Sequence, residues 1–222
     1  MLEARNLTAV FEGRVVFQNL SLAVEPGERV QVAAPSGAGK TTLARILAGY
    51  ASPQAGEVLV DGAPLSRRGV CSVQLIGQHP ERAVDARCRM ASMLAEAPAD
   101  EGELARLRAA FGIQDRWLSR YPHELSGGEL QRFCIVRALA ANPRYLIADE
   151  ISTMLDALTQ AHIWQALLAE AETRDLGLIL TTHSAALAAR IATRVVGVGS
   201  RPMVPPTPSV DSSWTDACQT RI

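Results

Sequence analysis

The stretch VAAPSGAGKTTL at residues 32–43 decides the fold, because it joins an apolar strand to a helix through a glycine-rich turn. The backbone N–H groups from Gly37 to Thr42 can converge on phosphate oxygens at the start of such a helix. In the pattern G-x-x-x-x-G-K-[ST], Lys40 reaches the β- and γ-phosphates and the Thr41 hydroxyl ligates Mg²⁺. Thr42 is placed to touch the α-phosphate. These residues predict a nucleotide triphosphate site.

One position departs from this pattern, since Ala34 stands where glycine is expected. A residue before proline, here Pro35, is pushed towards extended conformations that alanine adopts without strain. Only a positive φ would cost alanine roughly 1–2 kcal/mol. The glycines at which the backbone must approach phosphate, Gly37 and Gly39, are present. We therefore expect a negative φ at Ala34 and a working loop; the alternative is a defective loop in a module that binds nucleotide without hydrolysis.

The bulk composition predicts one large domain. The chain has 222 residues, 48% of them hydrophobic, and a net charge of −1, so it has no general attraction to nucleic acid or anionic membranes. The four cysteines are scattered without a CxxC pair, which argues against a disulfide framework or a closed zinc site. The N-terminus does not resemble a signal peptide, and no apolar run approaches the roughly 20 residues that span a bilayer. Work at a membrane would therefore require a partner.

Strands alternate with helices along most of the chain, which predicts an α/β fold with a parallel sheet covered on its faces. The first thirty residues read as antiparallel strands, and a segment rich in Ala, Arg and Glu from about 81 to 125 reads as an inserted helical subdomain. Beyond residue 200 the chain is rich in Pro and Ser and is expected to be disordered or loosely docked. The other expected elements are strands at 29–34, 56–62, 145–149, 177–182 and 195–199, and helices at 40–50, 127–141, 156–174 and 184–194.

The apolar segment YLIADE at 145–150 ends in two acids. Asp149 could hold Mg²⁺ through water, and Glu150 could orient or deprotonate an attacking water. Successive side chains of a strand point to opposite faces, so both acids can serve one phosphate only if the strand ends or twists there. The alternative is a strand end that places carboxylates in solvent. The phosphate loop upstream favours the functional interpretation.

The sequence ELSGGELQR at 124–132 predicts a helix start with an unusual composition. Ser126 and Glu129 fit the capping box S-x-x-E of an ordinary helix. That interpretation does not explain Gly127 and Gly128, since each costs about 1 kcal/mol relative to alanine in a helix. Bare N–H groups beside a serine hydroxyl form a second anion-binding terminus. One γ-phosphate does not need two such termini from one chain, which indicates a site shared between subunits.

The motifs SGAGKTT, LSGGELQR, YLIADE and TTHS, in this order and spacing, resemble those of the ATP-binding cassette (ABC) ATPases. The resemblance implies a P-loop NTPase (RecA-like) parallel-sheet core with an N-terminal antiparallel β subdomain and an inserted helical subdomain. The nucleotide-binding domain would cover 1–200, with the helical subdomain at about 81–130 and a C-terminal tail at 201–222. The resemblance also implies a head-to-tail dimer, homo- or heteromeric, with two ATP molecules between one subunit's phosphate loop and the other's signature LSGGE.

Four further residues take roles from this resemblance. Gln78 in IGQHP matches a glutamine that ligates Mg²⁺ and communicates with a membrane subunit, and His183 in TTHS matches a histidine that contacts the γ-phosphate. Asp156 matches a loop that couples the two sites, and Phe11 lies where an aromatic ring stacks on adenine. Each has an alternative: a polar strand end for Gln78 and His183, a helix N-cap for Asp156, and a core position for Phe11. The predicted nucleotide-binding residues are Phe11, Ser36, Gly37, Ala38, Gly39, Lys40, Thr41, Thr42, Ser126, Gly127, Gly128 and Asp156; the predicted metal ligands are Thr41, Gln78 and Asp149; the predicted catalytic residues are Glu150, His183 and Gln78.

Residues 76–98 and 121–164 resemble the ATPases of dipeptide, oligopeptide and nickel importers. Ile151 stands where proline usually follows the glutamate, and Met154 where a small residue is usual. Many relatives carry a C-terminal extension with clustered cysteines, and Cys218 alone cannot ligate a cluster. The resemblance implies an ATP-hydrolysing subunit, peripheral to the cytoplasmic face of the inner membrane, which powers uptake of a peptide, nickel or other small solute through separate integral-membrane permease subunits. An extracytoplasmic solute-binding protein would be an indirect partner, and nucleic acid would not be one.

Two other classes of cassette ATPase remain to be weighed. An accessory ATPase of a soluble enzyme complex, such as phosphonate carbon–phosphorus lyase, would co-purify with soluble enzyme subunits rather than a permease. DNA-repair and ribosome-associated cassettes carry long coiled coils or two cassettes per chain, and neither fits this sequence. We therefore keep the importer as the leading hypothesis and the soluble complex as its alternative.

Overall fold

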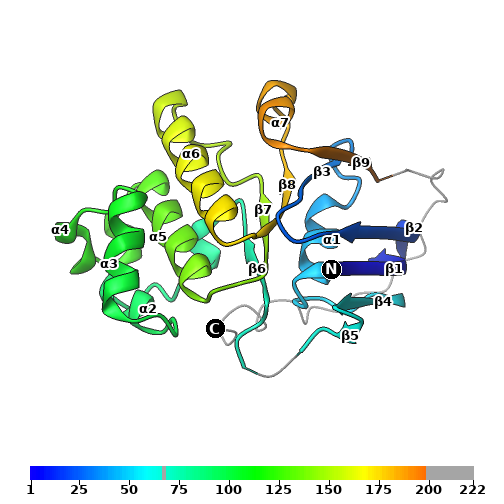
Figure 1. Cartoon of the computed structure of the whole chain (residues 1–222), viewed down its shortest axis with the longest axis horizontal. Helices are drawn as coiled ribbons and strands as arrows, with labels where there is room; N and C mark the ends of the chain where they lie inside the picture. Colours follow the sequence, from blue (N-terminus) through cyan, green and yellow to red (C-terminus); the bar gives the residue numbers. More distant parts are fainter. Residues whose placement is uncertain (67–68, 199–222) are drawn as a thin grey trace.

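The computed structural model describes residues 1–66 and 69–198, so the tail expected at 201–222 lies outside the described residues. Two sheets lie side by side (Figure 1). The antiparallel sheet has the order β2-β1-β4-β5, from β1 (Leu2–Phe11), β2 (Arg14–Val24), β4 (Ala55–Val60) and β5 (Ala63–Pro64). The second sheet has the order β6-β7-β8-β3-β9 with all pairs parallel, from β3 (Arg29–Ala33), β6 (Val73–Ile76), β7 (Tyr145–Asp149), β8 (Gly177–Thr181) and β9 (Arg194–Gly197). The predicted fold class is confirmed.

Most of the short helices gather at one end of the molecule. Figure 1 shows α2, α3, α4 and α5 gathered at the end opposite the antiparallel sheet, with α6 between them and the parallel strands. The described α-helices are α1 (Lys40–Leu47), α2 (Met90–Ala95), α3 (Glu101–Ala110), α4 (Asp115–Leu118), α5 (Gly127–Ala140), α6 (Ala157–Thr173) and α7 (Ala185–Ile191), and two short 3-10 turns are η1 (Pro80–Arg82) and η2 (Pro122–Glu124).

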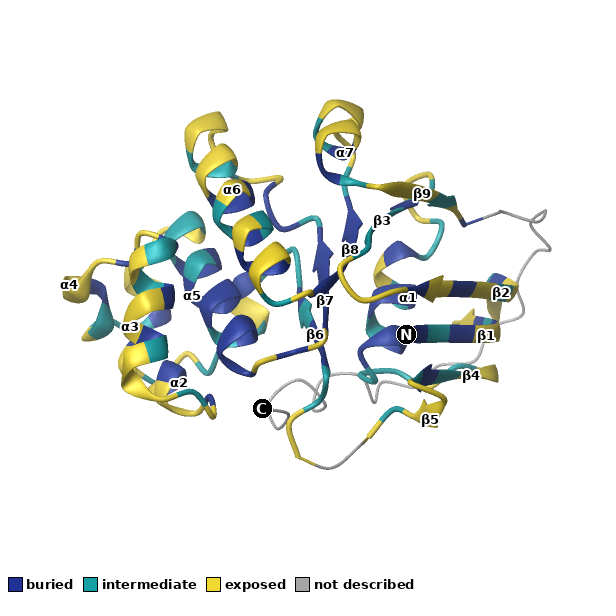
Figure 2. Cartoon of the chain, viewed as in Figure 1, coloured by how far each residue is buried: buried dark blue, intermediate teal, exposed yellow. Residues whose placement is uncertain are grey.

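The hydrophobic core has two parts, because alternate side chains of the central parallel strands point to opposite faces of the sheet. Every residue of β7 and β8 is buried, as expected for strands covered on both faces (Figure 2). Tyr145 and Ile147 face a cluster that contains α1 and the antiparallel strands, whereas Leu146 and Ala148 face a cluster formed mainly by α2, α3, α5 and α6. Helix α1, which follows the phosphate loop, therefore packs between the two sheets.

The strand that leads into the phosphate loop is in the interior of the parallel sheet. Val30 of β3 pairs with Ile179 of β8 on one side and with Arg194 of β9 on the other. Because the strands are parallel, the carboxyl ends of β3, β7 and β8 meet at one edge of the sheet. Ligand sites of open parallel sheets form at this edge, and it is where the loop, the two acids and TTHS arrive.

The predicted helical subdomain opens without an α-helix, and one predicted helix is shorter in the structure. Within the segment at about 81–125, only the turn η1 precedes α2, because Pro80 opens a tight turn and Arg87 donates its backbone N–H to the Asp85 carboxylate instead of continuing a helix. The helix expected at 184–194 ends at Ile191, and Arg194 begins β9. The prediction of a helix as far as residue 194 was wrong, since apolar spacing does not fix the residue at which a helix ends.

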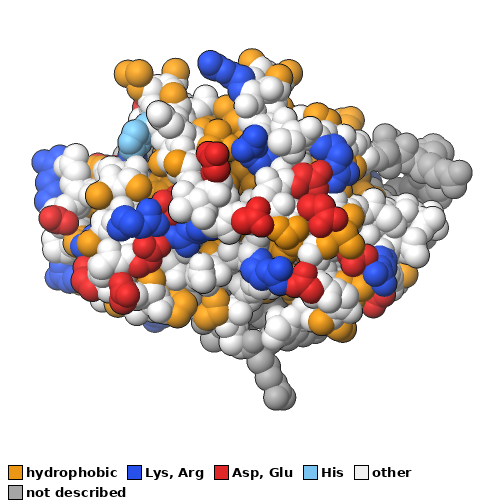
Figure 3. Space-filling view, in the orientation of Figure 1, with side chains coloured by type: hydrophobic (Ala, Val, Ile, Leu, Met, Phe, Trp, Pro, Cys, Tyr) orange, Lys and Arg blue, Asp and Glu red, His pale blue; other side chains and the backbone are white. Residues whose placement is uncertain are grey.

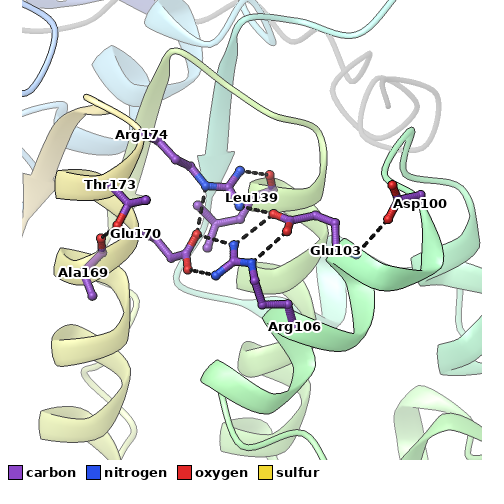
Figure 4. A network of polar contacts seen from close by, with 8 residues as sticks. All are labelled: Asp100, Glu103, Arg106, Leu139, Ala169, Glu170, Thr173 and Arg174. Atoms are coloured by element: carbon purple, nitrogen blue, oxygen red, sulfur yellow. Dashed lines mark hydrogen bonds and ion pairs between the residues drawn. The ribbon is translucent and has the colours of Figure 1, made fainter.

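An ionic network around the buried Glu170 carboxylate fastens α3 to α6 (Figure 4). The Glu170 side chain, 7% exposed, accepts hydrogen bonds from Arg106 at 2.6 and 2.8 Å and from Arg174 Nε at 2.8 Å. Arg174 also donates to the carbonyl of Leu139 at the end of α5 at 3.0 Å, and both arginines pair with Glu103. The ends of three helices thus share one set of charge-assisted hydrogen bonds.

Candidate functional site

The phosphate loop depends on two glycines with left-handed backbone. Gly37 has φ 76° and Gly39, which precedes the first residue of α1, has φ 90°. A Cβ atom on Gly39 would lie 2.1 Å from Cγ1 of Val16 in the antiparallel sheet. The loop therefore requires glycine at 39 both for its conformation and for its close approach to β2.

Ala34 has the conformation that the sequence predicts. It is not among the described non-glycine residues with positive φ. Its carbonyl oxygen accepts a hydrogen bond from Lys40 Nζ at 3.0 Å, and the Pro35 carbonyl accepts a second at 3.4 Å. These bonds use the backbone alone, so alanine in place of glycine does not disturb them. The expectation of a negative φ at Ala34 is confirmed.

The strand end at YLIADE explains how two adjacent acids reach one site. Strand β7 ends at Asp149, and Glu150 has φ 53°, in the left-handed region. The Glu150 N–H donates to both the side-chain and backbone oxygens of Thr181, at 3.1 and 3.2 Å. Asp149 is 2% exposed, and its carboxylate accepts a hydrogen bond of 2.6 Å from the Thr181 hydroxyl. Strand alternation thus breaks at Glu150, as the sequence argument requires if both acids serve one phosphate.

Three ionisable side chains meet in front of the loop. The Glu150 carboxylate lies 2.7 Å from His183 Nε2 and 3.9 Å from Lys40 Nζ. Glu150 and Lys40 are largely buried, while His183 is about half exposed. They share a cavity of about 270 Å³, lined by Ser36, Gly37, Gly39, Lys40, Thr41, Thr42, Glu150 and His183. A cavity that brings a carboxylate, a lysine and the residues of a glycine-rich loop together is suited to hold a phosphate ester and accept a proton from water.

Other candidate residues lie outside the lining of this cavity. Ala38 belongs to the loop but does not line it, and Asp149 lies behind Glu150 at the end of β7. Gln78 follows β6 and is partly buried; the carbonyl of its neighbour Gly77 accepts a hydrogen bond from Gln131 at 3.4 Å. Phe11 is 44% exposed at the end of β1, so the alternative that it is a core residue is wrong.

The signature segment forms a separate, well-capped helix start. Ser126 Oγ accepts the Glu129 N–H at 3.3 Å, and the Glu129 carboxylate accepts the Ser126 N–H at 2.7 Å, which confirms the capping box. Apart from the chain neighbours of Gly127 and the backbone of its own helix, no residue within 1–66 and 69–198 has an atom within 4 Å of a Cβ built there, so this face of the turn is open towards the described chain. None of these residues lines the cavity at the phosphate loop. The signature turn and the phosphate loop therefore lie at separate places on the chain.

Asp156 is the N-cap of α6, as one of the two sequence interpretations requires. Its carboxylate accepts the N–H groups of Leu158 and Thr159 at 3.1 and 3.0 Å. These hydrogen bonds, above all that from Thr159, lower the pKa of Asp156. The cap fixes the turn between Glu150 and α6. This structural role is compatible with a role in coupling two nucleotide sites.

The candidate magnesium ligands fit a cation that also binds phosphate. Within 1–66 and 69–198, no group of three or more His, Cys, Asp or Glu side chains could hold a metal ion. The Thr41 hydroxyl, the Asp149 carboxylate and the Gln78 amide are oxygen donors, as Mg²⁺ prefers, and Mg²⁺ commonly takes its remaining ligands from substrate phosphates and water. The donor set therefore fits Mg²⁺ bound together with a nucleotide rather than held by the protein alone.

Thr181 is a site residue that the sequence analysis missed. Its hydroxyl donates to Asp149 and accepts from the Glu150 N–H, so it fixes both acids. The signal was available, because Thr181 ends an apolar strand two residues before His183, but a single threonine in a strand is ordinary.

None of the described helices combines the length and the apolar character that crossing a bilayer requires.

Comparison with known proteins agrees with this geometry. The ABC transporter family model matches residues 17–153. The nickel import ATP-binding protein NikE of Brucella suis is 33% identical, over 86% of this chain and 78% of its own length. The putative 2-aminoethylphosphonate import ATP-binding protein PhnT of Salmonella choleraesuis is 32% identical over 86% of this chain, which spans only 54% of that relative.

Solved structures give the same result. An ATP-binding subunit of an ABC transporter superposes with a TM-score of 0.78 at 25% identity, covering 89% of this chain and 85% of its own. A dimeric bacterial ABC transporter cassette superposes equally well, with a TM-score of 0.78 at 25% identity, 89% of this chain and 94% of the other. The predicted resemblance, including that to the ATPases of nickel importers, is confirmed. With its phosphate loop, its acidic strand end and its signature helix in these places, the chain belongs to the ABC transporter family, as an ATPase cassette.

Proposed function

We propose that this cassette hydrolyses ATP to power a membrane importer of a small solute. The observation that carries the proposal is the pair formed by Glu150 and His183, which faces the phosphate loop across a cavity of about 270 Å³. The similarity to import ATPases for nickel and for 2-aminoethylphosphonate supports import, and leaves the solute open among small metal, peptide and phosphonate species.

The chain's own groups account for the chemistry. The loop N–H groups and Lys40 hold the β- and γ-phosphates; Lys40 exchanges its two backbone carbonyl acceptors for phosphate oxygens. Glu150 orients a water molecule and accepts its proton as oxygen attacks the γ-phosphorus, and the bond to ADP breaks. His183 holds the Glu150 carboxylate at 2.7 Å and is placed to contact the γ-phosphate. The products are ADP and phosphate.

Mg²⁺ would be held directly by Thr41 and Gln78, and through water by Asp149. When bound, the ion neutralises charge on the β- and γ-phosphates. The buried position of Asp149 and its hydrogen bond from Thr181 keep that carboxylate in one orientation for this purpose.

The full site would form between two cassettes. Ser126, Gly127 and Gly128 present an open, capped helix start that the chain's own cavity does not use. A second cassette would supply this turn to the γ-phosphate, consistent with the dimeric cassette that superposes on this chain. Phe11 would stack on the adenine ring from the exposed end of β1.

ATP turnover tests the assignment of Glu150. The Glu150→Gln variant keeps the size and one acceptor oxygen but cannot accept a proton, so we expect turnover to fall by about 100-fold or more with ATP still bound. The control is Glu57→Gln, on an exposed position of β4. Wild-type turnover in the Glu150→Gln variant would remove Glu150 from the mechanism.

Co-purification from the native host separates the importer from the soluble alternative. The tagged chain should copurify with integral-membrane subunits after detergent extraction, and ATP turnover of that complex should respond to the transported solute. Capture of soluble carbon–phosphorus lyase subunits in place of a permease would favour the accessory ATPase.

A further inference from the structure

Ser152 is a buried polar residue in the turn that leads from Glu150 to α6. It is 6% exposed, and its Oγ accepts a hydrogen bond of 2.8 Å from Gln160 Nε2 and another of 3.0 Å from Trp164 Nε1. Gln160 and Trp164 are four residues apart on α6, so they lie on the same face of the helix. The Ser152 hydroxyl thus fastens the turn to α6.

The backbone of Glu150 depends on the attachments around it. Its φ of 53° is left-handed, a conformation that costs free energy for a residue with a side chain and persists only where the surrounding structure enforces it. On one side, the Glu150 N–H donates to Thr181 of β8. On the other side, the Glu150 carbonyl accepts the Thr153 hydroxyl at 3.1 Å and the Thr153 N–H at 3.3 Å. Ser152 directly precedes Thr153, so its bonds to α6 fix the second attachment.

The outer side of this turn has little packing to support it. Met154 is 71% exposed, and Leu158 in the first turn of α6 is 85% exposed. Figure 3 shows hydrophobic side chains projecting into solvent at this end of α6. The turn therefore depends on its inner side, where Ser152 meets α6.

Trp164 does more on this inner side than fill space. Its side chain is 4% exposed and belongs to the hydrophobic core around α5 and α6, a role that any large apolar side chain could serve. The indole N–H adds a donor, and that donor is directed at Ser152. Trp117 of α4 offers a comparison: it is 6% exposed in the same core, and within 1–66 and 69–198 its indole N–H has no hydrogen-bond partner.

We propose that Trp164 is a positioning residue for ATP hydrolysis: its indole N–H, acting through the Ser152 hydroxyl, holds the turn that directs the Glu150 carboxylate into the cavity at the phosphate loop. This step rests on the proposed function, in which Glu150 orients the attacking water. Placement of the carboxylate matters for the chemical step, whereas the loop and Lys40 hold the phosphates. Loss of the hydrogen bond therefore lowers kcat and leaves the KM for ATP nearly unchanged.

ATP turnover of the full chain with Mg²⁺ tests this role. Trp164→Phe removes the donor and keeps an aromatic ring, so we expect kcat to fall about fivefold, with a KM for ATP within about twofold of the parent. The matched control is Trp117→Phe, which removes an indole N–H without a partner in the described chain and should keep the parental kcat. Ser152→Ala removes the acceptor. The double variant of Ser152→Ala and Trp164→Phe should be no slower than Ser152→Ala alone, because both changes remove the same hydrogen bond.

Hydrogen exchange separates a hold on the turn from a general loss of stability. The backbone amides of residues 150–156 should exchange at least about threefold faster in Trp164→Phe than in Trp117→Phe, while the amides of β8 exchange alike in both. Equal exchange at 150–156 in the two variants would overturn the role of Trp164.

The turnover data distinguish the failure of this role from the failure of the proposed function. A parent that hydrolyses no ATP, or a Glu150→Gln variant with parental turnover, would overturn the proposed function and the role of Trp164 together. If Glu150→Gln is inactive, the role of Trp164 alone is overturned by parental kcat in Trp164→Phe, by an equal loss in Trp117→Phe, or by a double variant that multiplies the two single losses.

Discussion

Removing the Glu170 carboxylate should destabilise the chain far more than removing any nearby surface charge. Glu170 accepts three charge-assisted hydrogen bonds from Arg106 and Arg174, and its side chain is only 7% exposed. Breaking a fully buried ion pair costs about 3–5 kcal/mol. Here the cost is smaller, because Arg106 is about half exposed and Arg174 keeps Glu103 and the Leu139 carbonyl as acceptors.

We expect Glu170→Ala to lower the free energy of unfolding by about 2–3 kcal/mol and Glu170→Gln, which retains one acceptor oxygen, by about 1–2 kcal/mol. For a domain of this size each kcal/mol shifts Tm by about 2–4 °C. Glu170→Ala should therefore unfold about 5–10 °C below the parent in differential scanning calorimetry. The control is Glu172→Gln, an exposed carboxylate in the last turn of the same helix, which should stay within about 0.5 kcal/mol.

The pH dependence of the free energy of unfolding gives a second test of the role of Glu170. Hydrogen bonds from Arg106, followed by the neighbouring charge of Arg174, hold the pKa of Glu170 below its ordinary value of 4.5. A carboxylate with a lowered folded pKa stabilises the protein above its unfolded pKa, and this stabilisation is lost as the pH falls through the folded value. The difference between parent and Glu170→Gln should therefore be full at pH 7 and shrink below about pH 4.5. Equal stability of the two at pH 7, or an equal loss in Glu172→Gln, would refute the reasoning.

Three substitutions near the phosphate loop have expected outcomes that differ in kind. Gly39→Ala should lose ATP binding measured by calorimetry, because its Cβ would lie 2.1 Å from Val16 Cγ1 at a φ of 90°; binding within about threefold of wild type would contradict this. Ala34→Gly should change ATP affinity less than about twofold, since its φ is not positive and Lys40 bonds only its carbonyl; a tenfold gain would revive the defective-loop alternative. Thr181→Val should lower kcat about tenfold or more by freeing the buried Asp149 carboxylate, with unchanged turnover as the contrary result.

The sequence predicts those features of the site that are local in the chain. The phosphate loop, the strand that ends at Asp149 and the capping box of Ser126 and Glu129 each depend on residues only a few positions apart, so propensity and turn chemistry are sufficient to find them. The departure at Ala34 could also be interpreted correctly, because the following proline restricts its backbone. The order of the family motifs then predicts the order of the helices and strands along the chain.

Features that join distant segments could not be found in this way. The 2.7 Å contact between Glu150 and His183 depends on β7 and β8 lying side by side, and the left-handed turn at Glu150 depends on the hydrogen bonds that the Glu150 N–H donates to Thr181. The Glu170 network requires the relative rotation of three helices, which apolar spacing leaves open. Exposed Leu158 looks in sequence like one more apolar residue of a helix, and only the packing of α6 leaves it in water.

The interior position of β3 has a consequence for how the protein is made. The strand that carries the phosphate loop pairs with β8 and β9, whose residues lie about 150 positions later in the chain. During synthesis the first 170 residues therefore expose both edges of β3, and the loop has no fixed frame on which to hold a nucleotide. Long-range parallel pairing is slow because the chain entropy of closing such a loop is lost before contacts repay it. ATP can then stabilise the fold only after β8 and β9 have been made, and until then β3 has two unpaired edges of the kind that favour aggregation.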